Sequence, residues 1–209
     1  MGSEFIKLYP DNPSQNKIIH IAEILRNGGV LIYPTDTIYG LGCDIFNHKA
    51  VEKIKRIKGI NSKHLNFSFI CHDLSQTSKY VRNFSTTVYK VLKKALPGPF
   101  TFIMNASSRA PKTVLSGKRT VGIRIPDNSI PVEIVKELGN PIVTTSIRDE
   151  DEVIEYSTDP ELIFEKFKHQ VDAVINGGPG DNIPSTVIDC TDDSFRVLRE
   201  GKGDISQFF

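Results

Sequence analysis

Short apolar runs typical of buried strands alternate along this chain with longer segments of helical periodicity, and this alternation constrains the fold most strongly. Apolar residues recur every three or four positions in five segments, as on one face of a helix. These predicted helices span residues 13–27, 47–58, 85–96, 129–138 and 158–167. The predicted strands are residues 30–33, 67–70, 100–104, 121–125, 142–145, 173–175, 186–189 and 196–198. Helices between strands favour parallel pairs and the last strands lack them, so we expect one α/β domain around a large, twisted, largely parallel or mixed sheet.

Capping residues predict where several of these helices begin and end. Asn47 is expected to cap the second helix, and Ser129 the fourth. Thr158 and Glu161 have the spacing of a capping box at the start of the fifth helix. Gly139 follows the fourth helix, at a position where glycine commonly ends a helix.

Charge and cysteine content restrict the classes of protein to which the chain can belong. A net charge of +1 over 209 residues provides no global field to recruit nucleic acid or a membrane surface. No apolar run approaches the ~20 residues of a membrane span, and the N-terminus lacks the apolar core of a signal peptide. Cys43, Cys71 and Cys190 form no CxxC pair, so we expect three buried apolar thiols in a protein of the reducing cytoplasm.

Four segments next to predicted strands carry Ser, Thr or Arg where an apolar residue would serve a core better. They are PTDTIYG (34–40), KRTVGIRIP (118–126), VTTSIRD (143–149) and PSTVID (184–189). Each one alone is explained by the preference of threonine for strands near a turn. Ligands of α/β sheets bind at the carboxyl ends of strands, so the four together predict a shared site. Hydroxyls and arginine suit a polyanionic ligand with a small zwitterionic or hydroxylated partner.

Two charged segments of the sequence each have two possible interpretations. The densest basic cluster comprises Lys53, Lys55, Arg56, Lys58 and Lys63, and it is either a solvated helix face or a phosphate site. The acidic run DEDEVIE (149–155) is either a solvated loop or a segment that guards a cleft or holds Mg²⁺. The sequence contains no GxxxxGK[ST] P-loop and no HExxH, which excludes a P-loop ATPase and an HExxH metalloprotease.

Five motifs occur in the order and spacing of one known family. They are YPTDTIYGLGCD, LPGPFTFI, TVGIRIP, PIVTTS and STVIDC followed by VLREG. The chain resembles the YrdC/YciO family from about residue 15 to residue 203, and FSFICHDLS and STVIDCTDD resemble its YciO branch. The resemblance implies one open α/β domain over 15–203 with a deep basic cavity, an N-terminal extension at 1–14 and a C-terminal tail at 204–209.

The resemblance also implies chemistry. Characterised YrdC-type members combine L-threonine, bicarbonate and ATP into L-threonylcarbamoyl-adenylate and release pyrophosphate. That product supplies the threonylcarbamoyl group placed on adenosine of certain tRNAs. ATP with Mg²⁺ is therefore implied, and the family pattern assigns no metal-ligating residue to the chain. The family has also been described as binding double-stranded RNA, so RNA is an alternative partner.

Residues that match the family pattern receive their expected roles from the resemblance alone. Lys58 and Ser146 are expected to be catalytic. Thr37, Arg124 and Thr144 are expected to bind the threonine, with Arg124 at its carboxylate. The residues expected to bind the nucleotide are Lys58, Asn66, Thr120, Ser146, Arg148, Ser185 and Arg199.

Two positions depart from the synthase signature of the family, which contains a Lys-x-Arg pair and a Ser-x-Asn pair. Ile60 stands in place of the arginine and Arg148 in place of the asparagine. A lost charge-assisted phosphate contact costs about 1.5–3 kcal/mol, which is roughly 10–100-fold in rate. Arg148 either replaces the missing guanidinium or pairs with the acidic run. Besides a synthase, the alternatives are a YciO-branch enzyme that acts on the adenylate or a related nucleotide without efficient synthesis, and a non-catalytic RNA- or nucleotide-binding protein.

Overall fold

The computed structural model of the chain describes residues 2–59, 67–115, 119–147, 158–192 and 194–208. The helices in these residues are α1 (Gln15–Arg26), α2 (His48–Ile57), α3 (Leu74–Tyr80), α4 (Thr86–Ala95), α5 (Ser129–Leu138) and α6 (Pro160–Phe167). The strands are β1 (Glu4–Lys7), β2 (Leu31–Tyr33), β3 (Gly40–Asp44), β4 (Ser68–Ile70), β5 (Phe100–Asn105), β6 (Thr120–Arg124), β7 (Ile142–Ser146), β8 (Ala173–Asn176), β9 (Thr186–Asp189) and β10 (Arg196–Arg199). Two short 3₁₀ turns are η1 (Lys112–Val114) and η3 (Ile205–Gln207).

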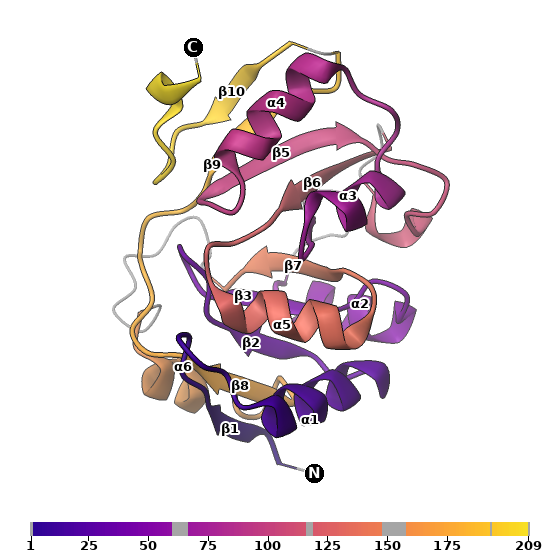
Figure 1. Cartoon of the computed structure of the whole chain (residues 1–209). Coiled ribbons are helices and arrows are strands. Elements are labelled where there is room, and N and C mark those ends of the chain that lie inside the picture. The colour runs from indigo at the N-terminus through magenta and orange to yellow at the C-terminus, as the bar shows by residue number, and fades with distance from the viewer. Residues whose placement is uncertain (1, 60–66, 116–118, 148–157, 193, 209) are drawn as a thin grey trace.

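All of these strands belong to one mixed sheet. Its order is β1-β8-β2-β3-β7-β4-β6-β5-β9-β10 (Figure 1). The pairs β1–β8, β8–β2, β4–β6 and β5–β9 are parallel. The other neighbours are antiparallel. The predicted α/β domain with a large mixed sheet is therefore confirmed.

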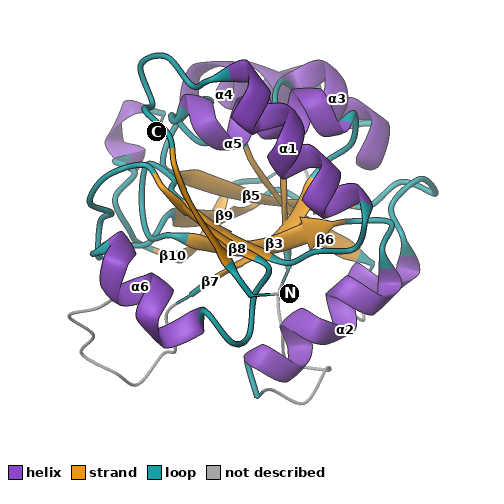
Figure 2. Ribbon diagram, turned by 90° about the horizontal axis from the view of Figure 1, so that it is seen from below, coloured by secondary structure: helices purple, strands orange, loops and turns teal. Residues whose placement is uncertain are grey.

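Helices cover both faces of this sheet, and each face has its own apolar core. The smaller core joins α1 and α5 to β1, β2 and β8 and includes the fully buried Ile21 and Ile134. The larger core contains residues of α2, α3, α4 and α6 and of the central strands, among them Ile54 and Phe102. Figure 2 shows α1 and α5 on the opposite side of the sheet from α2 and α6. Each fully buried aliphatic or aromatic side chain stabilises the fold by about 1.5–3 kcal/mol, so the two apolar faces determine where the helices lie.

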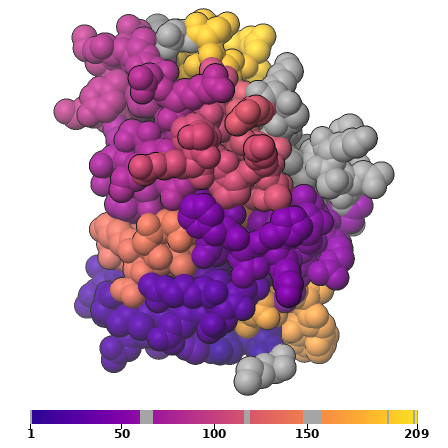
Figure 3. All heavy atoms as spheres, turned by 90° about the vertical axis from the view of Figure 1, so that its right-hand side faces the viewer, coloured from indigo at the N-terminus to yellow at the C-terminus, as the bar shows by residue number. Residues whose placement is uncertain are grey.

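The two edges of the sheet lie close to the two ends of the chain. β1 is one edge strand and β10 is the other. Figure 3 shows the N-terminal residues in indigo and the C-terminal residues in yellow at opposite ends of the molecule. The Phe208 and Phe100 rings are 5.3 Å apart between centroids, so the C-terminal residues pack back on β5. No helix within the described ranges combines the length and apolarity needed to cross a membrane.

Two of the predicted helix starts are wrong. Asn128, not Ser129, caps α5, and its side chain accepts the second backbone N–H of the helix at 3.0 Å. Asp159, rather than a box of Thr158 and Glu161, caps α6 and accepts the backbone N–H of Glu161 at 2.8 Å. Aspartate is a better N-cap than threonine, which explains the choice at α6, whereas asparagine and serine are equivalent caps and the one-residue difference at α5 follows from the backbone, which is extended at Asn128. The predicted cap at the start of α2 is confirmed.

Among the described strands and α-helices, three were not predicted from the sequence, namely β1, β3 and α3. β3 contains two glycines, which are depleted from strands, yet it pairs with both β2 and β7. β1 lies within the expected N-terminal extension, but it pairs with β8, so the sheet begins at Glu4. α3 has seven residues, too few to display a clear helical period.

The three cysteines are buried thiols that form no disulfide, as predicted. Burial raises the pKa of the Cys71 thiol to about 12, and burial also raises the pKa of Cys43. Since the thiolate is the nucleophilic form, both side chains are unreactive apolar residues at neutral pH.

Candidate functional site

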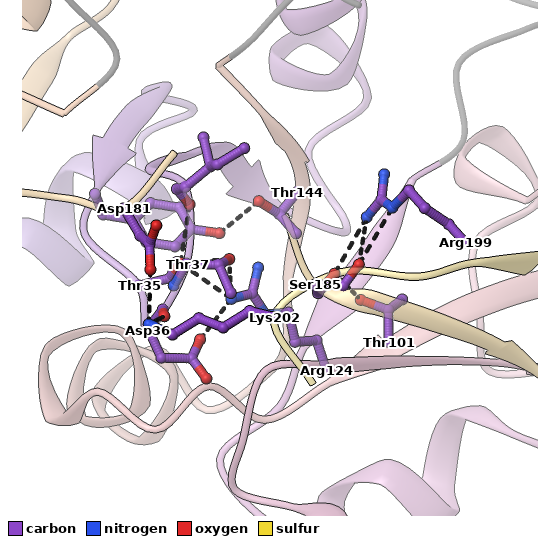
Figure 4. A network of polar contacts seen from close by, with 12 residues as sticks. Thr35, Asp36, Thr37, Thr101, Arg124, Thr144, Asp181, Ser185, Arg199 and Lys202 are labelled. Carbon is purple, nitrogen blue, oxygen red and sulfur yellow. Dashed lines mark hydrogen bonds and ion pairs between the residues drawn. The ribbon is translucent and has the colours of Figure 1, made fainter. Parts of the chain in front are cut away.

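A buried arginine meets the loop that follows β2. Arg124, the last residue of β6, donates from Nη2 to the hydroxyls of Thr35 (3.0 Å) and Thr37 (2.6 Å). The same nitrogen lies 2.5 Å from Oδ1 of Asp36. Figure 4 shows these three side chains pointing toward the guanidinium. Two of the polar segments singled out in the sequence, 34–40 and 118–126, are therefore in direct contact.

The two threonines of this loop have different tasks. The Thr35 hydroxyl accepts the backbone N–H of Thr37 (3.1 Å) and donates to the carbonyl of Ile38 (2.9 Å). A hydroxyl donates one hydrogen and accepts two, so the bond from Arg124 uses its remaining capacity. Thr35 thus shapes the turn, while the buried Thr37 presents its hydroxyl to the guanidinium.

The two glycines of β3 make room for the ring of Tyr33. A Cβ on Gly40 would lie 2.9 Å from Cζ of Tyr33, and one on Gly42 would lie 3.1 Å from Cε1. The ring therefore lies across both glycines, and its hydroxyl donates to Oγ1 of Thr144 at 2.6 Å. Burial raises the pKa of Tyr33, so the phenol is a protonated donor at neutral pH. Thr144 was predicted from the sequence as a site residue, whereas Tyr33, which positions it, was not.

Small side chains align across four adjacent strands near Arg124. Thr144 in β7 is paired with Gly42 in β3 and with Ser68 in β4. Ser68 is in turn paired with Gly122 in β6. Directly paired residues of neighbouring strands point to the same face of a sheet. A row without long side chains allows another group to approach this face closely.

A pocket of about 540 Å³ adjoins the Arg124 cluster. It is lined by Thr35, Asp36, Thr158, Pro179, Gly180, Asp181, Asn182 and Lys202. The Lys202 ammonium donates to the backbone carbonyl of Asp36 (2.7 Å) and pairs with the carboxylate of Asp181 (2.8 Å). The backbone N–H of Asp181 donates to the carbonyl of Thr37 at 3.1 Å. Lys202 and Asp181 were not predicted as site residues, because no local pattern links them to a loop so far away in the chain.

The Asp181 carboxyl group is expected to titrate below its usual range. Burial opposes its ionisation, but the Lys202 ammonium and two backbone N–H groups outweigh burial and lower its pKa from the usual 3.8. Its contribution to stability is therefore present above pH 3.8 and is lost as the pH falls below that value. In an NMR titration, the carboxyl carbon should have a midpoint below 3.8 in the wild type and a higher one in Lys202→Ala. An equal midpoint in both proteins would show that Lys202 is not the partner in solution.

A second polar cluster forms around Ser185. Its hydroxyl lies 2.8 Å from that of Thr101, and Nε and Nη2 of Arg199 donate to its carbonyl at 3.2 and 2.9 Å. Figure 4 shows this cluster beside the Arg124 cluster. The backbone N–H of Lys202 donates to the carbonyl of Pro184 at 2.8 Å, so the C-terminal segment contacts both clusters. Two predicted nucleotide-binding residues, Ser185 and Arg199, are thus in contact with each other.

The remaining described residues with expected roles come from α2, β6 and β7. Lys58 is the C-cap of α2, and Ser146 is the exposed last residue of β7. Thr120 begins β6, so about 13 Å of strand separates it from Arg124. The prediction that the polar segments share the carboxyl ends of strands is wrong for Thr120 and Ser185, which lie at the starts of β6 and β9.

Some of the predicted residues cannot be placed. Asn66 and Arg148 lie outside the described residues, as do Ile60, Lys63 and the acidic run at 149–155. In the described part of the basic cluster, Lys53 pairs with Asp172 and Lys55 with Glu52, each at 2.7 Å. These ion pairs neutralise the two lysines and so weigh against a phosphate site for them, and Lys55, whose side chain is 14% exposed, does not lie on a solvated face either.

The described residues do not fit a resident metal ion. Among them, no group of three or more His, Cys, Asp or Glu side chains is arranged to hold one. Asp36 and Asp181, the two carboxylates that line the pocket, both pair with basic side chains. Mg²⁺ commonly binds through few carboxylates plus substrate phosphates, so the expected Mg²⁺ is a companion of the nucleotide and remains a prediction.

Comparisons with known proteins relate this fold to described families and relatives. The Sua5/YciO/YrdC family model, described as "Telomere recombination", matches residues 23–201. YciO of Escherichia coli (strain K12) is 41% identical over 208 residues, which is 99% of each chain. The threonylcarbamoyl-AMP synthase of Bacillus subtilis is 31% identical over 189 residues, which is 88% of this chain and 53% of that protein.

Solved structures agree with these relationships. The crystal structure of E. coli YciO has a TM-score of 0.91 at 39% identity and covers 99% of this chain and 100% of that one. P. abyssi Sua5 complexed with L-threonine has a TM-score of 0.89 at 25% identity and covers 98% of this chain and 59% of that one. The resemblance carried by the five motifs, including the likeness to YciO, is confirmed. By its sequence and by its fold, the chain belongs to the Sua5/YciO/YrdC family.

Proposed function

We propose that the chain binds L-threonine, bicarbonate and ATP and forms L-threonylcarbamoyl-AMP, pyrophosphate and water. The observation that carries the proposal is the buried guanidinium of Arg124, which bonds to the hydroxyls of Thr35 and Thr37 at a strand end. A planar, permanently charged guanidinium suits the carboxylate of an amino acid. The P. abyssi Sua5 protein, solved with L-threonine, supports this ligand for a site on the same fold.

The proposed chemistry needs positioning rather than a covalent enzyme intermediate. Arg124 holds the threonine carboxylate, and Thr37 and Thr144 lie near its polar groups. The unprotonated threonine amine adds to CO₂ from bicarbonate and loses a proton, which gives a carbamate. A carbamate oxygen attacks the α-phosphorus of ATP, the bond from that phosphorus to the bridging oxygen breaks, and pyrophosphate leaves. The protein contributes by orienting the reactants and neutralising phosphate charge.

The nucleotide is assigned to the other side of the site. Thr120 lies about 13 Å from Arg124 along β6, which suits an extended ligand with an amino acid at one end and a nucleotide at the other. Lys58 and Ser146 are the proposed catalytic residues beside the phosphates. Further proposed nucleotide contacts are Asn66 and Arg148, together with Ser185 and Arg199, which lie beside the Arg124 cluster rather than beside Thr120. We assign the product to tRNA threonylcarbamoyladenosine modification in the cytoplasm.

A second candidate function follows from two residue changes. Ile60 and Arg148 stand where the synthase signature has arginine and asparagine. Because these changes remove a phosphate contact, the second candidate is an enzyme that acts on threonylcarbamoyl-AMP or a related nucleotide without making it efficiently. A non-catalytic binder of double-stranded RNA is less well supported, since a net charge of +1 offers little attraction to a phosphate backbone.

Pyrophosphate release tests the proposal. Purified protein should release pyrophosphate when ATP, L-threonine and bicarbonate are all present, and Arg124→Ala should not. Arg196→Ala removes an exposed arginine that pairs with Asp189 and should retain the wild-type rate. AMP formation from supplied threonylcarbamoyl-AMP, without synthesis, would favour the second candidate. Absence of both activities, together with salt-sensitive RNA binding, would contradict both and indicate a binding protein.

A further inference from the structure

The ion pair between Arg124 and Asp36 is buried at the edge of the pocket. Oδ1 of Asp36 lies 2.5 Å from Nη2 of Arg124, and the two side chains are only 9% and 11% exposed. Ion pairs in such surroundings stabilise a fold only when the remaining polar atoms of both partners also find hydrogen bonds. The bonding of both side chains can therefore be checked atom by atom.

The hydrogen bonding of this ion pair is incomplete on both side chains. Nη2 of Arg124 has three acceptors within bonding distance, in Thr35, Asp36 and Thr37, but it carries two hydrogens. Within the described part of the chain, Nε of Arg124 and Oδ2 of Asp36 are buried and have no hydrogen-bond partner. Asp36 thus bonds to the arginine through one oxygen and one nitrogen, whereas a carboxylate can bond to a guanidinium through two parallel bonds. Nη2 of Arg124 therefore has more acceptors than hydrogens, whereas the hydrogen on Nε has no acceptor among the described residues.

The backbone around Asp36 is held in place independently of its side chain. The Lys202 ammonium donates to the Asp36 carbonyl, and the Thr35 hydroxyl bonds to the backbone on the far side of Asp36. A rotation of the Asp36 side chain can therefore release the guanidinium without unfolding the loop. The pocket beside it offers space for an incoming group.

We propose that Asp36 is an internal competitor, whose carboxylate occupies in the free protein the place on Arg124 that the carboxylate of an amino-acid ligand takes. This inference rests on the proposed function in that the ligand is an amino acid. The incoming carboxylate bonds to both Nε and Nη2 and displaces Asp36. Asp36 thereby determines specificity: a ligand without a carboxylate has nothing to exchange for the lost ion pair, so neutral analogues are rejected.

Chemical rescue of Asp36→Asn by formate tests this exchange. Thermal unfolding and ligand affinity are measured in a chloride-free buffer at constant ionic strength. Formate, the smallest carboxylate, should raise the melting temperature of the variant by several degrees more than that of the wild type. The Kd for L-threonine should fall roughly tenfold in the variant, because a neutral amide competes less well for the guanidinium. The Kd for L-threoninamide should also fall, because the ion pair that excludes neutral analogues is absent from the variant.

Asp189→Asn is the matched control. Its carboxylate is similarly buried, at 13% exposure, and pairs with Arg196 at 2.7 Å outside the site. Formate should not raise the melting temperature of Asp189→Asn more than that of the wild type, and its Kd for L-threonine should equal that of the wild type. Equal formate responses in all three proteins would overturn the proposal. So would weaker threonine binding by Asp36→Asn, because that result would make Asp36 a permanent orienting partner of Arg124.

The outcomes separate this inference from the proposed function. Formate rescue without threonine binding by any variant supports the exchange on Arg124 but contradicts threonine as the ligand. Threonine binding that Asp36→Asn leaves unchanged contradicts the exchange but not the proposed function. If Asp36→Asn folds neither with nor without formate, NMR of the wild-type Arg124 Nε–H decides. Its resonance should shift on addition of formate, and a constant resonance overturns the proposal.

Discussion

Arg124→Ala is expected to weaken L-threonine binding at least about 100-fold, because two charge-assisted hydrogen bonds to the ligand carboxylate disappear together. The same change leaves the Asp36 carboxylate buried without its counter-ion. Removing one partner of a buried ion pair costs ~3–5 kcal/mol of folding stability. Calorimetric titration with L-threonine, alongside urea unfolding, measures both effects on the same protein.

Two further variants make this result interpretable. Arg124→Lys keeps the positive charge but loses the planar fork, so it should fold more stably than Arg124→Ala and still bind threonine about tenfold more weakly than the wild type. Arg196→Ala, at an arginine side chain that is 71% exposed, should not change the affinity and should cost at most about 1 kcal/mol of stability. Wild-type threonine affinity in Arg124→Ala would rule out Arg124 as the carboxylate site.

Gly42→Ala is expected to destabilise the fold by about 1–3 kcal/mol or more, which is typical of overpacking a filled core. The added Cβ would lie 2.6 Å from Cγ2 of Ile142 and 2.8 Å from the carbonyl oxygen of Val143. The carbonyl belongs to the paired strand β7, so it cannot move away without breaking the ladder. The ring of Tyr33 on the same side would also be displaced from Thr144. The midpoint of urea unfolding should fall with an unchanged m-value.

Gly2→Ala provides the control for Gly42→Ala. No atom lies within 4 Å of a Cβ at this position, so its unfolding midpoint should equal that of the wild type. A wild-type midpoint for Gly42→Ala as well would show that Tyr33 and β7 are less tightly packed on β3 in solution. In that case the glycines would need an explanation other than the tyrosine ring.

Much of the fold could be predicted from the sequence, because its strongest signals are local. The apolar stripe of α1 and the buried run of β2 are periodic over enough residues to be recognised without knowledge of their neighbours. β3 could not be recognised in this way, because its glycines have low strand propensity. They are accommodated by the ring of Tyr33, which becomes their neighbour only when β2 and β3 pair.

The candidate site was predictable only in part. Arg124, Thr37 and Thr144 were identified through the family motifs, and the structure places Arg124 against Thr37. Lys202 and Asp181 were missed, because a lone lysine and a lone aspartate carry no local signal. Their importance depends on a contact between Lys202 and the Asp36 carbonyl across 166 positions of the chain.

By itself, the sequence determined the class of fold, the family and the residue types available for ligand binding, since periodicity and motif order are properties of neighbouring residues. Only the tertiary structure decided which of those residues meet. In the sheet, β3, β7 and β4 lie between β2 and β6, yet the loop after β2 reaches Arg124 at the end of β6 and places Asp36 against it, 88 positions away. A buried charge must find its counter-ion wherever the fold brings one close, and for Arg124 that is the carboxylate that an amino-acid ligand would have to displace.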